Sequence, residues 1–277
     1  MKDTTIAIIG GTGKMGALFS AVFERAGFEV RVCGRRSSSR CREIIADSGI
    51  VMVSVPIRDT VPVIREVAPL LCDDQVICDL TSLKMAPVEA MLASRASVIG
   101  LHPMFGPTVR SLAGQTIIAT PARASEETLA SFLAIFEREG ARITCTTAEE
   151  HDRMMAVVQG LTHCITLTVA ETMRRLEMTP EETMPYRSPV YQIEMGLVGR
   201  LLSQDPDLYG DILMQNPFVR PVLAACEEAI VHIRQVIDGQ DTEAFSSLFS
   251  ENARHFDGYC RKAAEETDLL IDAMVMK

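Results

Sequence analysis

The sequence predicts an α/β domain over residues 1–147 followed by an all-helical domain over residues 148–277. Up to about residue 147, short apolar runs alternate with helical patterns, which is typical of parallel β-α-β units and a doubly wound sheet. The first apolar run ends in a glycine-rich turn. After Thr147 strand-like runs give way to helical patterns alone. Together these observations indicate a nucleotide-binding class of fold with a helical domain appended to it.

Seven apolar runs of strand length are expected to form the sheet. They cover residues 5–10, 28–33, 50–55, 75–79, 97–101, 116–119 and 142–145. Helical stretches such as Arg58–Leu71 and Glu126–Glu139 lie between them. In sheets of this kind, ligands bind beyond the carboxyl ends of the strands. Three short segments fall there and are therefore candidates for a site: Ser54-Val55-Pro56, Thr81-Ser82 and His102-Pro103.

The turn after the first strand has the spacing of a dinucleotide-binding fingerprint. It reads Gly11-Thr12-Gly13-Lys14-Met15-Gly16 and leads directly into a helical pattern. We expect the first glycine to allow the tight bend, the second to let the backbone approach a pyrophosphate, and the third to let the helix pack on its strand. The helix N-terminus offers N–H groups and a positive dipole to the phosphates. Glycine-rich turns also occur without a ligand, but this position between strand and helix favours nucleotide binding in a Rossmann-type domain.

The end of the second strand bears on the choice of cofactor. An Asp or Glu about 20 residues past the glycines normally binds the ribose of NAD. Here that place is Gly34, followed by Arg35 and Arg36. Guanidinium groups can donate forked hydrogen bonds to a 2′-phosphate, so the pair modestly favours NADP over NAD. A solvated basic loop is the alternative interpretation.

Composition excludes several other classes of protein. The 277 residues are 47% hydrophobic, which is ample for a buried core, and the net charge of −10 argues against binding to nucleic acid. No continuous apolar run approaches the roughly 20 residues of a membrane span, and the N-terminus lacks the pattern of a signal peptide. The eight cysteines show no CxxC pair and no metal-ligand spacing, so we expect reduced thiols and no metal site. The sequence predicts a cytoplasmic protein.

The helical half suggests how the chain assembles. Thr147-Ala-Glu-Glu150 has the composition of a helix start, and a helical pattern continues to about Met178. Further helices are expected at 190–203, 207–214, 218–238, 241–248 and 250–275. The long helix is apolar on more than one side and must therefore be buried on more than one side. Because this domain has few elements to cover it, we expect a homodimer.

Eight segments, in their order and spacing, resemble the prephenate dehydrogenase family, in particular the dehydrogenase part of bacterial chorismate mutase–prephenate dehydrogenases. The segments are Ile8–Gly16, Val53–Ile57, Asp79–Lys84, Gly100–Pro107, Glu150–Asp152, Gln159–His163, Ser188–Tyr191 and Gly199–Tyr209. The resemblance implies oxidative decarboxylation of prephenate to 4-hydroxyphenylpyruvate in tyrosine biosynthesis, with hydride transfer to NAD(P). It also implies dimerisation through the helical domain.

The resemblance assigns catalytic roles to His102 and Ser82. In the family reaction, hydride leaves the ring carbon that bears the hydroxyl group while the ring carboxylate departs as carbon dioxide. A histidine, with an ordinary pKa near 6.5, is suited to accept the hydroxyl proton, and His102 matches the catalytic histidine. Ser82 matches a serine that bridges histidine, substrate and nicotinamide. The alternatives are a histidine that caps a loop and an ordinary turn serine.

Four further residues are expected at the substrate. Arg200 matches an arginine that binds a substrate carboxylate through a forked pair of hydrogen bonds. Lys84, His163 and Tyr209 match residues near the substrate in relatives. A surface arginine paired with a glutamate, a solvated loop lysine, a core histidine and a core tyrosine are the respective alternatives.

Two positions depart from this scheme. His151 begins the long helix, and we expect it to be structural because it lies in the capping region. Gln192 stands where bifunctional relatives carry an arginine, which leaves the second anion contact open.

Two other functions remain open on the sequence. The first is arogenate (cyclohexadienyl) dehydrogenase, in which an amino group replaces the keto group of the substrate side chain. The second is a dinucleotide sensor that has lost the reaction, against which the presence of His102, Ser82 and Arg200 argues.

Overall fold

The computed structural model describes residues 4–34 and 39–275, and the chain forms two compact units. The first unit runs to Val158 and also takes in Asp207–Phe218. The second comprises Gln159–Pro206 and the chain from Val219 onward. The last strand ends at Cys145 and the next helix begins at Ala148, where the sequence predicts that strands give way to helices alone. The compact first unit nevertheless extends beyond that point, because two helical segments pack with the sheet domain.

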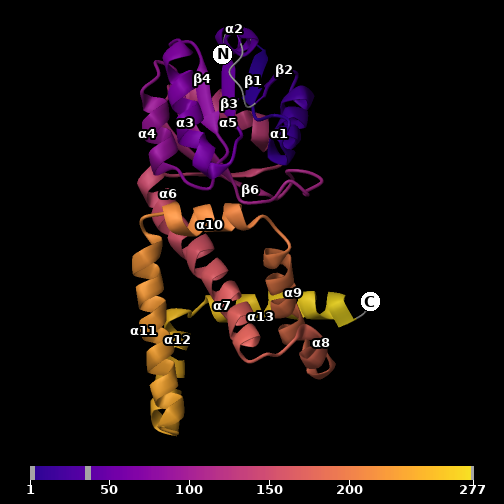
Figure 1. The fold of residues 1–277 in the computed structure, drawn as a ribbon, viewed down its shortest axis with the longest axis vertical. Coiled ribbons are helices and arrows are strands. Elements are labelled where there is room, and N and C mark those ends of the chain that lie inside the picture. Colours follow the sequence, from indigo (N-terminus) through magenta and orange to yellow (C-terminus); the bar gives the residue numbers. More distant parts are fainter. Residues whose placement is uncertain (1–3, 35–38, 276–277) are drawn as a thin grey trace. The chain divides into compact units, whose positions relative to one another are not determined.

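The first unit is built on one seven-stranded sheet (Figure 1). Its strands are β1 (Thr5–Ile9), β2 (Glu29–Cys33), β3 (Ile50–Val53), β4 (Val76–Asp79), β5 (Ser97–Pro103), β6 (Thr116–Arg123) and β7 (Arg142–Cys145). Every predicted run forms a strand, and the order across the sheet is β2-β1-β3-β4-β5-β6-β7. The pairing is parallel except between β5 and β6, which are antiparallel. The doubly wound, largely parallel sheet is thus confirmed, and β5 and β6 can run antiparallel because residues 104–115 join them without a crossover helix.

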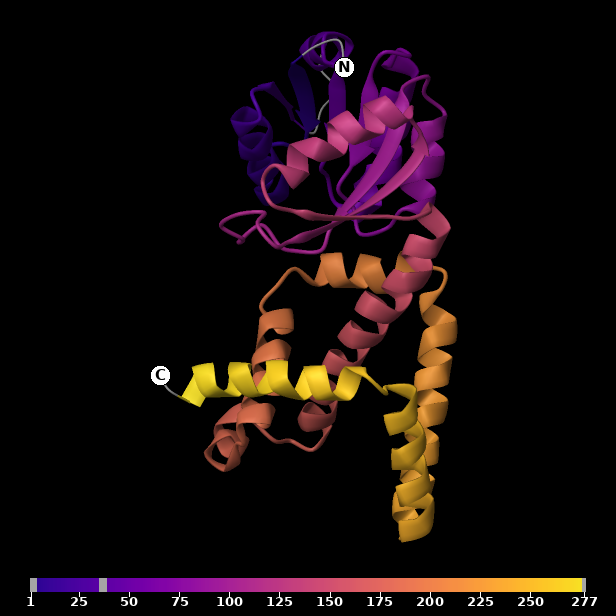
Figure 2. The same ribbon diagram turned by 180° about the vertical axis from the view of Figure 1, so that it is seen from behind.

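Helices cover both faces of the sheet, and the alternation of side chains along β1 shows how. Ile6 and Ile8 belong to the apolar core on one face, whereas Ala7 and Ile9 belong to the core on the other. The first core is covered by α1 (Lys14–Arg25) and α5 (Glu126–Glu137), and Figure 2 shows α5 lying across that face. The second is covered by α2 (Ser39–Ala46), α3 (Ile57–Val67) and α4 (Met85–Leu92). The sheet is therefore buried on both sides, which explains why its central strands read as continuous apolar runs.

The long helix predicted from Thr147 exists but is interrupted. It consists of α6 (Ala148–Met155), a π-helical segment (Ala156–Leu161) and α7 (Thr162–Arg175). The Thr147 hydroxyl accepts a hydrogen bond from the Glu150 amide, as the capping pattern predicts. By length and composition alone, this 28-residue helix could cross a membrane, although the sequence shows no continuous apolar run of that length. In α6, His151, Asp152 and Met155 are buried, whereas only 17% of the most apolar window of the whole helix is buried within the single chain.

The remaining helices follow the predicted order, with one wrong boundary. They are α8 (Pro180–Thr183), α9 (Pro189–Leu202), α10 (Pro206–Gln215), α11 (Val219–Asp238), α12 (Thr242–His255) and α13 (Tyr259–Val275). The predicted break near residue 249 is wrong, because α12 continues to His255 and the chain turns at Gly258, whose φ is +78°. Helix α10 is fixed to the first unit by Arg58, whose guanidinium pairs with Asp207 and Asp211 at 3.1 and 3.0 Å.

Candidate active site

The turn between β1 and α1 is shaped by its glycines. The residue in the left-handed region is Gly10, with φ of +80°, so the tight bend lies one residue before the predicted Gly11. A side chain on Gly10 would run into the carbonyl group of Ser54. A Cβ on Gly16 would lie 2.6 Å from the carbonyl oxygen of Gly10, so Gly16 allows α1 to approach the strand, as predicted. The turn is therefore held close against β1 and β3.

The N-terminus of α1 is open in a way that suits a pyrophosphate. Gly13 is the N-cap residue and has no side chain to bond the first-turn amides. Thr12, Gly13 and Lys14 are exposed, while Met15 is half-buried against the core. The N–H groups of a helix's first turn have no partners within the helix, so they can bind phosphate oxygens. The described residues of this turn thus fit a dinucleotide.

A cavity of about 670 Å³ lies beside the carboxyl ends of the first three strands. Ile9, Gly34 and Val55 contribute to its lining from the ends of β1, β2 and β3. Val63 and Arg42 line it from α3 and α2. This is the region of the fold in which the adenosine half of a dinucleotide binds. Ser54, Val55 and Pro56, predicted from their position alone, thus lie at the rim between β3 and α3.

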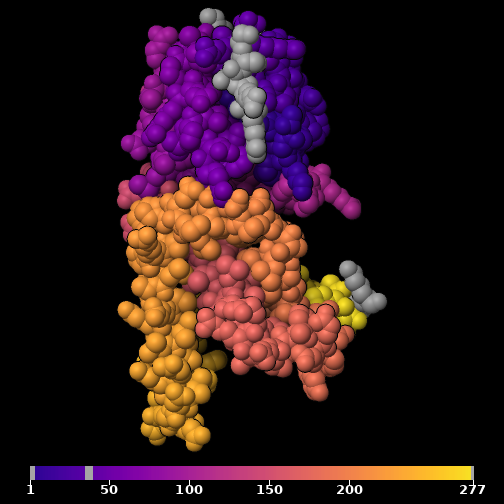
Figure 3. Space-filling view, in the orientation of Figure 1, coloured from indigo at the N-terminus to yellow at the C-terminus, as the bar shows by residue number. Residues whose placement is uncertain are grey.

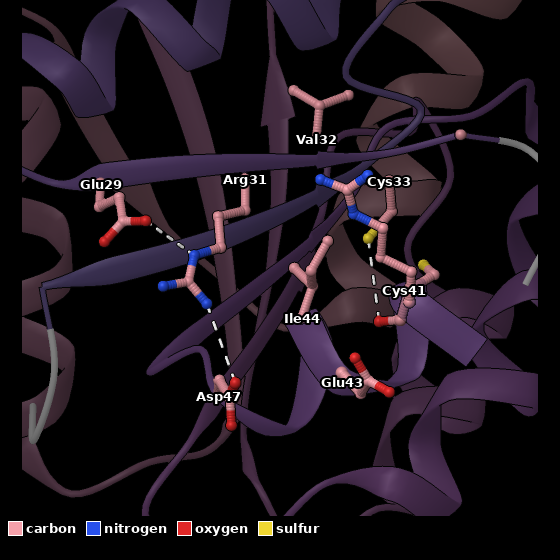
Figure 4. A pocket seen from close by; sticks show the side chains of 10 residues that line it. Glu29, Arg31, Val32, Cys33, Cys41, Glu43, Ile44 and Asp47 are labelled. Carbon is pink, nitrogen blue, oxygen red and sulfur yellow. Dashed lines mark hydrogen bonds and ion pairs between the residues drawn. The ribbon is translucent and has the colours of Figure 1, made fainter. Parts of the chain in front are cut away.

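A second cavity, of about 680 Å³, lies between β2 and α2 (Figure 4). Gly34 and Cys41 line both cavities. In the second one, Arg31 forms ion pairs with Glu29 at 2.8 Å and Asp47 at 3.9 Å, so its charge is locally balanced. Arg35 and Arg36, the predicted 2′-phosphate ligands, lie outside the described residues.

His102 lies near the end of β5, where the sequence places it, and its side chain is almost completely buried. Its Nδ1 atom is 2.8 Å from Nε2 of His151. Burial, reinforced by His151 and by the charge of Lys84, holds the pKa of His102 well below its usual value of 6.5. The expectation of a pKa near 6.5 is therefore too high, and His102 is neutral at pH 7. A neutral imidazole is the form that can accept a proton.

His151 does not cap α6, although the sequence places it in the capping region. Thr147 caps α6, and the His151 ring points instead to His102 and to Asp152, whose Oδ1 atom lies 2.7 Å from His151 Nδ1. The Asp152 carboxylate in turn accepts the backbone N–H groups of Lys84 and Met85 at 2.8 and 2.9 Å. Sequence reasoning missed this network, although the Glu150-His-Asp152 segment that carries it was among those that resemble the family.

Lys84 lies in the protein interior. The sequence analysis expected it either near the substrate or in a solvated loop. Its ammonium group forms an ion pair with the buried carboxylate of Asp79 and donates a hydrogen bond to the carbonyl of Leu101 at 2.8 Å. Gly100 leaves space for the lysine stem, since a Cβ there would lie 3.1 Å from Lys84 Cδ. Burial raises the pKa of Asp79 and lowers that of Lys84. Lys84 thus supports the strand that carries His102.

The other predicted site residues are distributed over both units. Ser82 is half-buried in the segment between β4 and α4, and Tyr209 is half-buried in α10 of the first unit. His163, in α7 of the second unit, is half-buried, and burial lowers its pKa. Arg200, near the end of α9 in the same unit, is exposed, and no carboxylate of the described chain forms an ion pair with it.

A β1–α1 turn that fits a dinucleotide and a buried neutral histidine near the carboxyl end of β5 in the same sheet fit the class of nicotinamide-dependent dehydrogenases. Two family models cover most of the chain. The model for the prephenate dehydrogenase nucleotide-binding domain matches residues 24–145, and the model for the prephenate dehydrogenase dimerization domain matches residues 147–251. The chain belongs to the prephenate dehydrogenase family, as its motifs indicate.

Individual relatives agree with this assignment. The chain is 32% identical to a probable arogenate/prephenate dehydrogenase of Methanocaldococcus jannaschii, over 99% of this chain and 66% of that protein. It is also 32% identical to the T-protein of Enterobacter agglomerans, over 96% of this chain and 71% of that protein. The chain thus spans about two thirds of the length of these curated relatives.

Solved structures show the same fold at lower identity. Arogenate dehydrogenase from Synechocystis superposes with a TM-score of 0.72 at 18% identity, covering 92% of this chain and 99% of that chain. Prephenate dehydrogenase from A. aeolicus, solved with hydroxyphenyl propionate and NAD+, gives a TM-score of 0.72 at 20% identity, covering 93% and 99%.

Proposed function

We propose that the protein is an NAD(P)-dependent prephenate dehydrogenase. The observation that carries the proposal is the buried neutral His102 at the end of β5, in a sheet whose β1–α1 turn fits a dinucleotide. The nicotinamide, when bound, accepts the hydride from the substrate ring. His102 accepts the proton of the ring hydroxyl as that carbon gains carbonyl character. Loss of the ring carboxylate as carbon dioxide makes the ring aromatic, and the proton returns to the oxygen, so charge and atoms balance.

The remaining predicted residues keep proposed roles around this step. Ser82 lies in the segment between β4 and α4 and is proposed to bridge His102 and the substrate hydroxyl. Arg200 is proposed to bind a substrate carboxylate, His163 to lie near the pyruvyl side chain of the substrate, and Tyr209 to lie near the site. For Lys84 we propose support of the β5 backbone in place of substrate binding, because its ammonium group is fully buried against Asp79.

The same site could act on arogenate, which differs from prephenate only in the side chain. The name of the relative from Methanocaldococcus jannaschii includes both substrates. The test is an assay of hydride transfer with prephenate and with arogenate, each with NAD and with NADP. We expect turnover of prephenate. Absence of turnover with either substrate and either cofactor would overturn the proposed function and favour a dinucleotide sensor.

For the cofactor we propose a modest preference for NADP, held by Arg35 and Arg36. In the same assay, Arg35→Ala and Arg36→Ala should weaken the affinity for NADP more than that for NAD. Better use of NAD by the wild-type chain, with both variants unchanged, would make these arginines a solvated loop.

Arg200→Gln is expected to raise the KM for prephenate by about ten- to a hundred-fold, because one charge-assisted contact to a carboxylate is worth roughly 1.5–3 kcal/mol. The dissociation constant of NAD(P), measured by fluorescence titration, should stay unchanged. Arg254→Gln, which removes an exposed arginine of α12 in the second unit, is the matched control. If cofactor affinity collapsed while KM held, Arg200 would belong to the cofactor and not to the substrate.

We also propose that the chain forms a homodimer through its helical part. The second unit exposes many large apolar side chains, including Ile230, Ile233 and Ile237 of α11. In the space-filling view, much of the surface of α11 is not covered by other parts of the chain (Figure 3). None of the described side chains of α7 is fully buried within the single chain. The family model that matches residues 147–251 is a dimerization domain, so a second copy of this chain is the proposed cover.

The dimer proposal predicts a mass in solution of about twice the 30.4 kDa of one chain. Light scattering at micromolar concentration measures it directly. A symmetric pairing also predicts that Ile233→Glu, placed in the open apolar face, shifts the mass toward that of one chain, whereas Glu227→Gln on the same helix does not. A monomer mass for the unaltered protein would contradict the proposal.

A further inference from the structure

Three buried side chains form a hydrogen-bonded series that includes His102. His102 Nδ1 lies 2.8 Å from His151 Nε2, and His151 Nδ1 lies 2.7 Å from Asp152 Oδ1. None of the three residues is more than 3% exposed. Water therefore does not supply alternative partners for these ring nitrogens, and each must donate or accept according to what its neighbour allows.

The Asp152 carboxylate fixes the direction of the series. Its two oxygens accept the backbone N–H groups of Lys84 and Met85, and a backbone N–H can only donate. Asp152 is thus an acceptor toward His151 as well, and His151 Nδ1 must carry a proton. Burial lowers the pKa of His151, so its ring is neutral at pH 7 and its Nε2 atom holds a lone pair.

The same argument then reaches His102. An acceptor at His151 Nε2 requires a proton on His102 Nδ1, and the neutral His102 ring then has its lone pair on Nε2. We propose that His151 and Asp152 are positioning residues that hold His102 in its Nδ1–H tautomer, so that Nε2 is the atom that accepts the proton of the substrate hydroxyl. This inference rests on the proposed role of His102 as the base.

The step that this arrangement prepares is a simple proton transfer. The O–H bond of the substrate breaks and an N–H bond forms at His102 Nε2, and the reverse occurs when the ring becomes aromatic. No oxidant enters this step. The logic is that of the aspartate that orients the catalytic histidine of serine proteases, with one histidine interposed. In the opposite tautomer, His102 Nε2 would carry a proton and could not act as a base.

The tautomer can be measured without the reaction. Nitrogen-15 NMR of the ring nitrogens distinguishes protonated from unprotonated Nδ1 and Nε2 in the full chain at pH 7.5. We expect neutral Nδ1–H rings at both His102 and His151, assigned with His102→Asn and His151→Gln. A proton on Nε2 of His102 would overturn the inference. Because no substrate is present, this result is independent of whether prephenate is turned over.

Variants at His151 test the consequence for turnover. In His151→Gln the amide oxygen can still accept the His102 Nδ1 proton, whereas His151→Leu leaves that N–H buried without a partner. We expect kcat to fall by roughly 10²-fold or more in the Leu variant and by clearly less in the Gln variant, since general-base catalysis contributes about 10²–10⁴-fold. KM and the dinucleotide dissociation constant should change little in both.

The matched control is His255→Leu, which removes an exposed histidine of α12 and should leave kcat unchanged. Asp152→Ala offers an independent test, because it removes the acceptor that holds the proton on His151 Nδ1. It should lower kcat and populate the Nε2–H form of His102 in the NMR spectrum. Equal kcat in the Leu and Gln variants, or an unchanged His102 tautomer with Asp152→Ala, would show His151 and Asp152 to be packing residues only.

Discussion

His102→Asn is expected to lower kcat by about 10²–10⁴-fold, the usual contribution of a general base. The asparagine can form a hydrogen bond to the substrate hydroxyl, but it cannot accept a proton at neutral pH. The dissociation constant of NAD(P) should be unchanged, because the described dinucleotide turn lies between β1 and α1 and does not include His102. Steady-state kinetics and a fluorescence titration of the cofactor measure the two quantities. Near-normal turnover in this variant would remove His102 from the mechanism.

The pH profile of the wild-type enzyme provides a second check on the same residue. The pKa of His102 is lowered by burial, by His151 and by Lys84, so the neutral base is present above that low pKa and is lost as the pH falls through it. Asp152 and Asp79 are the nearby carboxylates and Lys84 the nearby cation. We therefore expect kcat/KM to remain level from about pH 8 down past 6.5, the ordinary pKa of histidine, and to fall only below it. A loss of activity centred on 6.5 would contradict the buried geometry of His102.

Lys84→Met is expected to destabilise the first unit by about 3–5 kcal/mol, because it leaves the carboxylate of Asp79 buried without its cation. The Asp79 Oδ2 atom would keep the amide of Thr81, whereas Oδ1 already has no hydrogen-bond partner among the described residues. Urea unfolding at pH 7 measures the change. Burial raises the pKa of Asp79. The loss of stability in Lys84→Met, relative to the wild type, should therefore become smaller as the pH falls and the carboxyl group becomes neutral.

Two control variants test whether the loss of stability comes from the unpaired buried charge. Lys14→Met removes an exposed lysine of the same unit and should change stability by less than about 1 kcal/mol. Combining Lys84→Met with Asp79→Asn removes both charges and should recover part of the loss, because the buried charge is gone. If Lys84→Met were no more harmful than Lys14→Met, the pair would not be a significant part of the core.

The strands could be predicted because buried strands appear as short continuous runs of apolar residues. Strands such as Ile50–Val53 and Val76–Asp79 are covered by helices on both faces, so they appear as uninterrupted apolar runs. The start of α6 was also predictable, since Thr147 and the acidic first turn act within a few residues of one another. The same strand pattern placed His102 near the end of β5.

What the sequence did not reveal depends on contacts between distant segments. The bond between His102 and His151 joins residues 49 apart, and Asp152 accepts amides of residues 67 and 68 positions before it. Local patterns therefore suggested only a capping role for His151. The membership of α10 in the first unit likewise follows from the pairing of Arg58 with Asp211, 153 residues later. The bend at Gly10 was misplaced by one residue because only Gly11, Gly13 and Gly16 have the spacing of the motif, whereas the left-handed residue is the glycine just before them.

The buried ion pair of Asp79 and Lys84 also affects the net charge of the interior around His102. The charges of Asp79 and Lys84 sum to zero whichever of the two holds the proton between them. Because His102 and His151 are neutral, the carboxylate of Asp152 is left as one uncompensated negative charge. A proton taken up by His102 would offset that charge, but burial and the charge of Lys84 keep the ring neutral at rest. The imidazole therefore stays ready to accept a proton until the substrate hydroxyl supplies one.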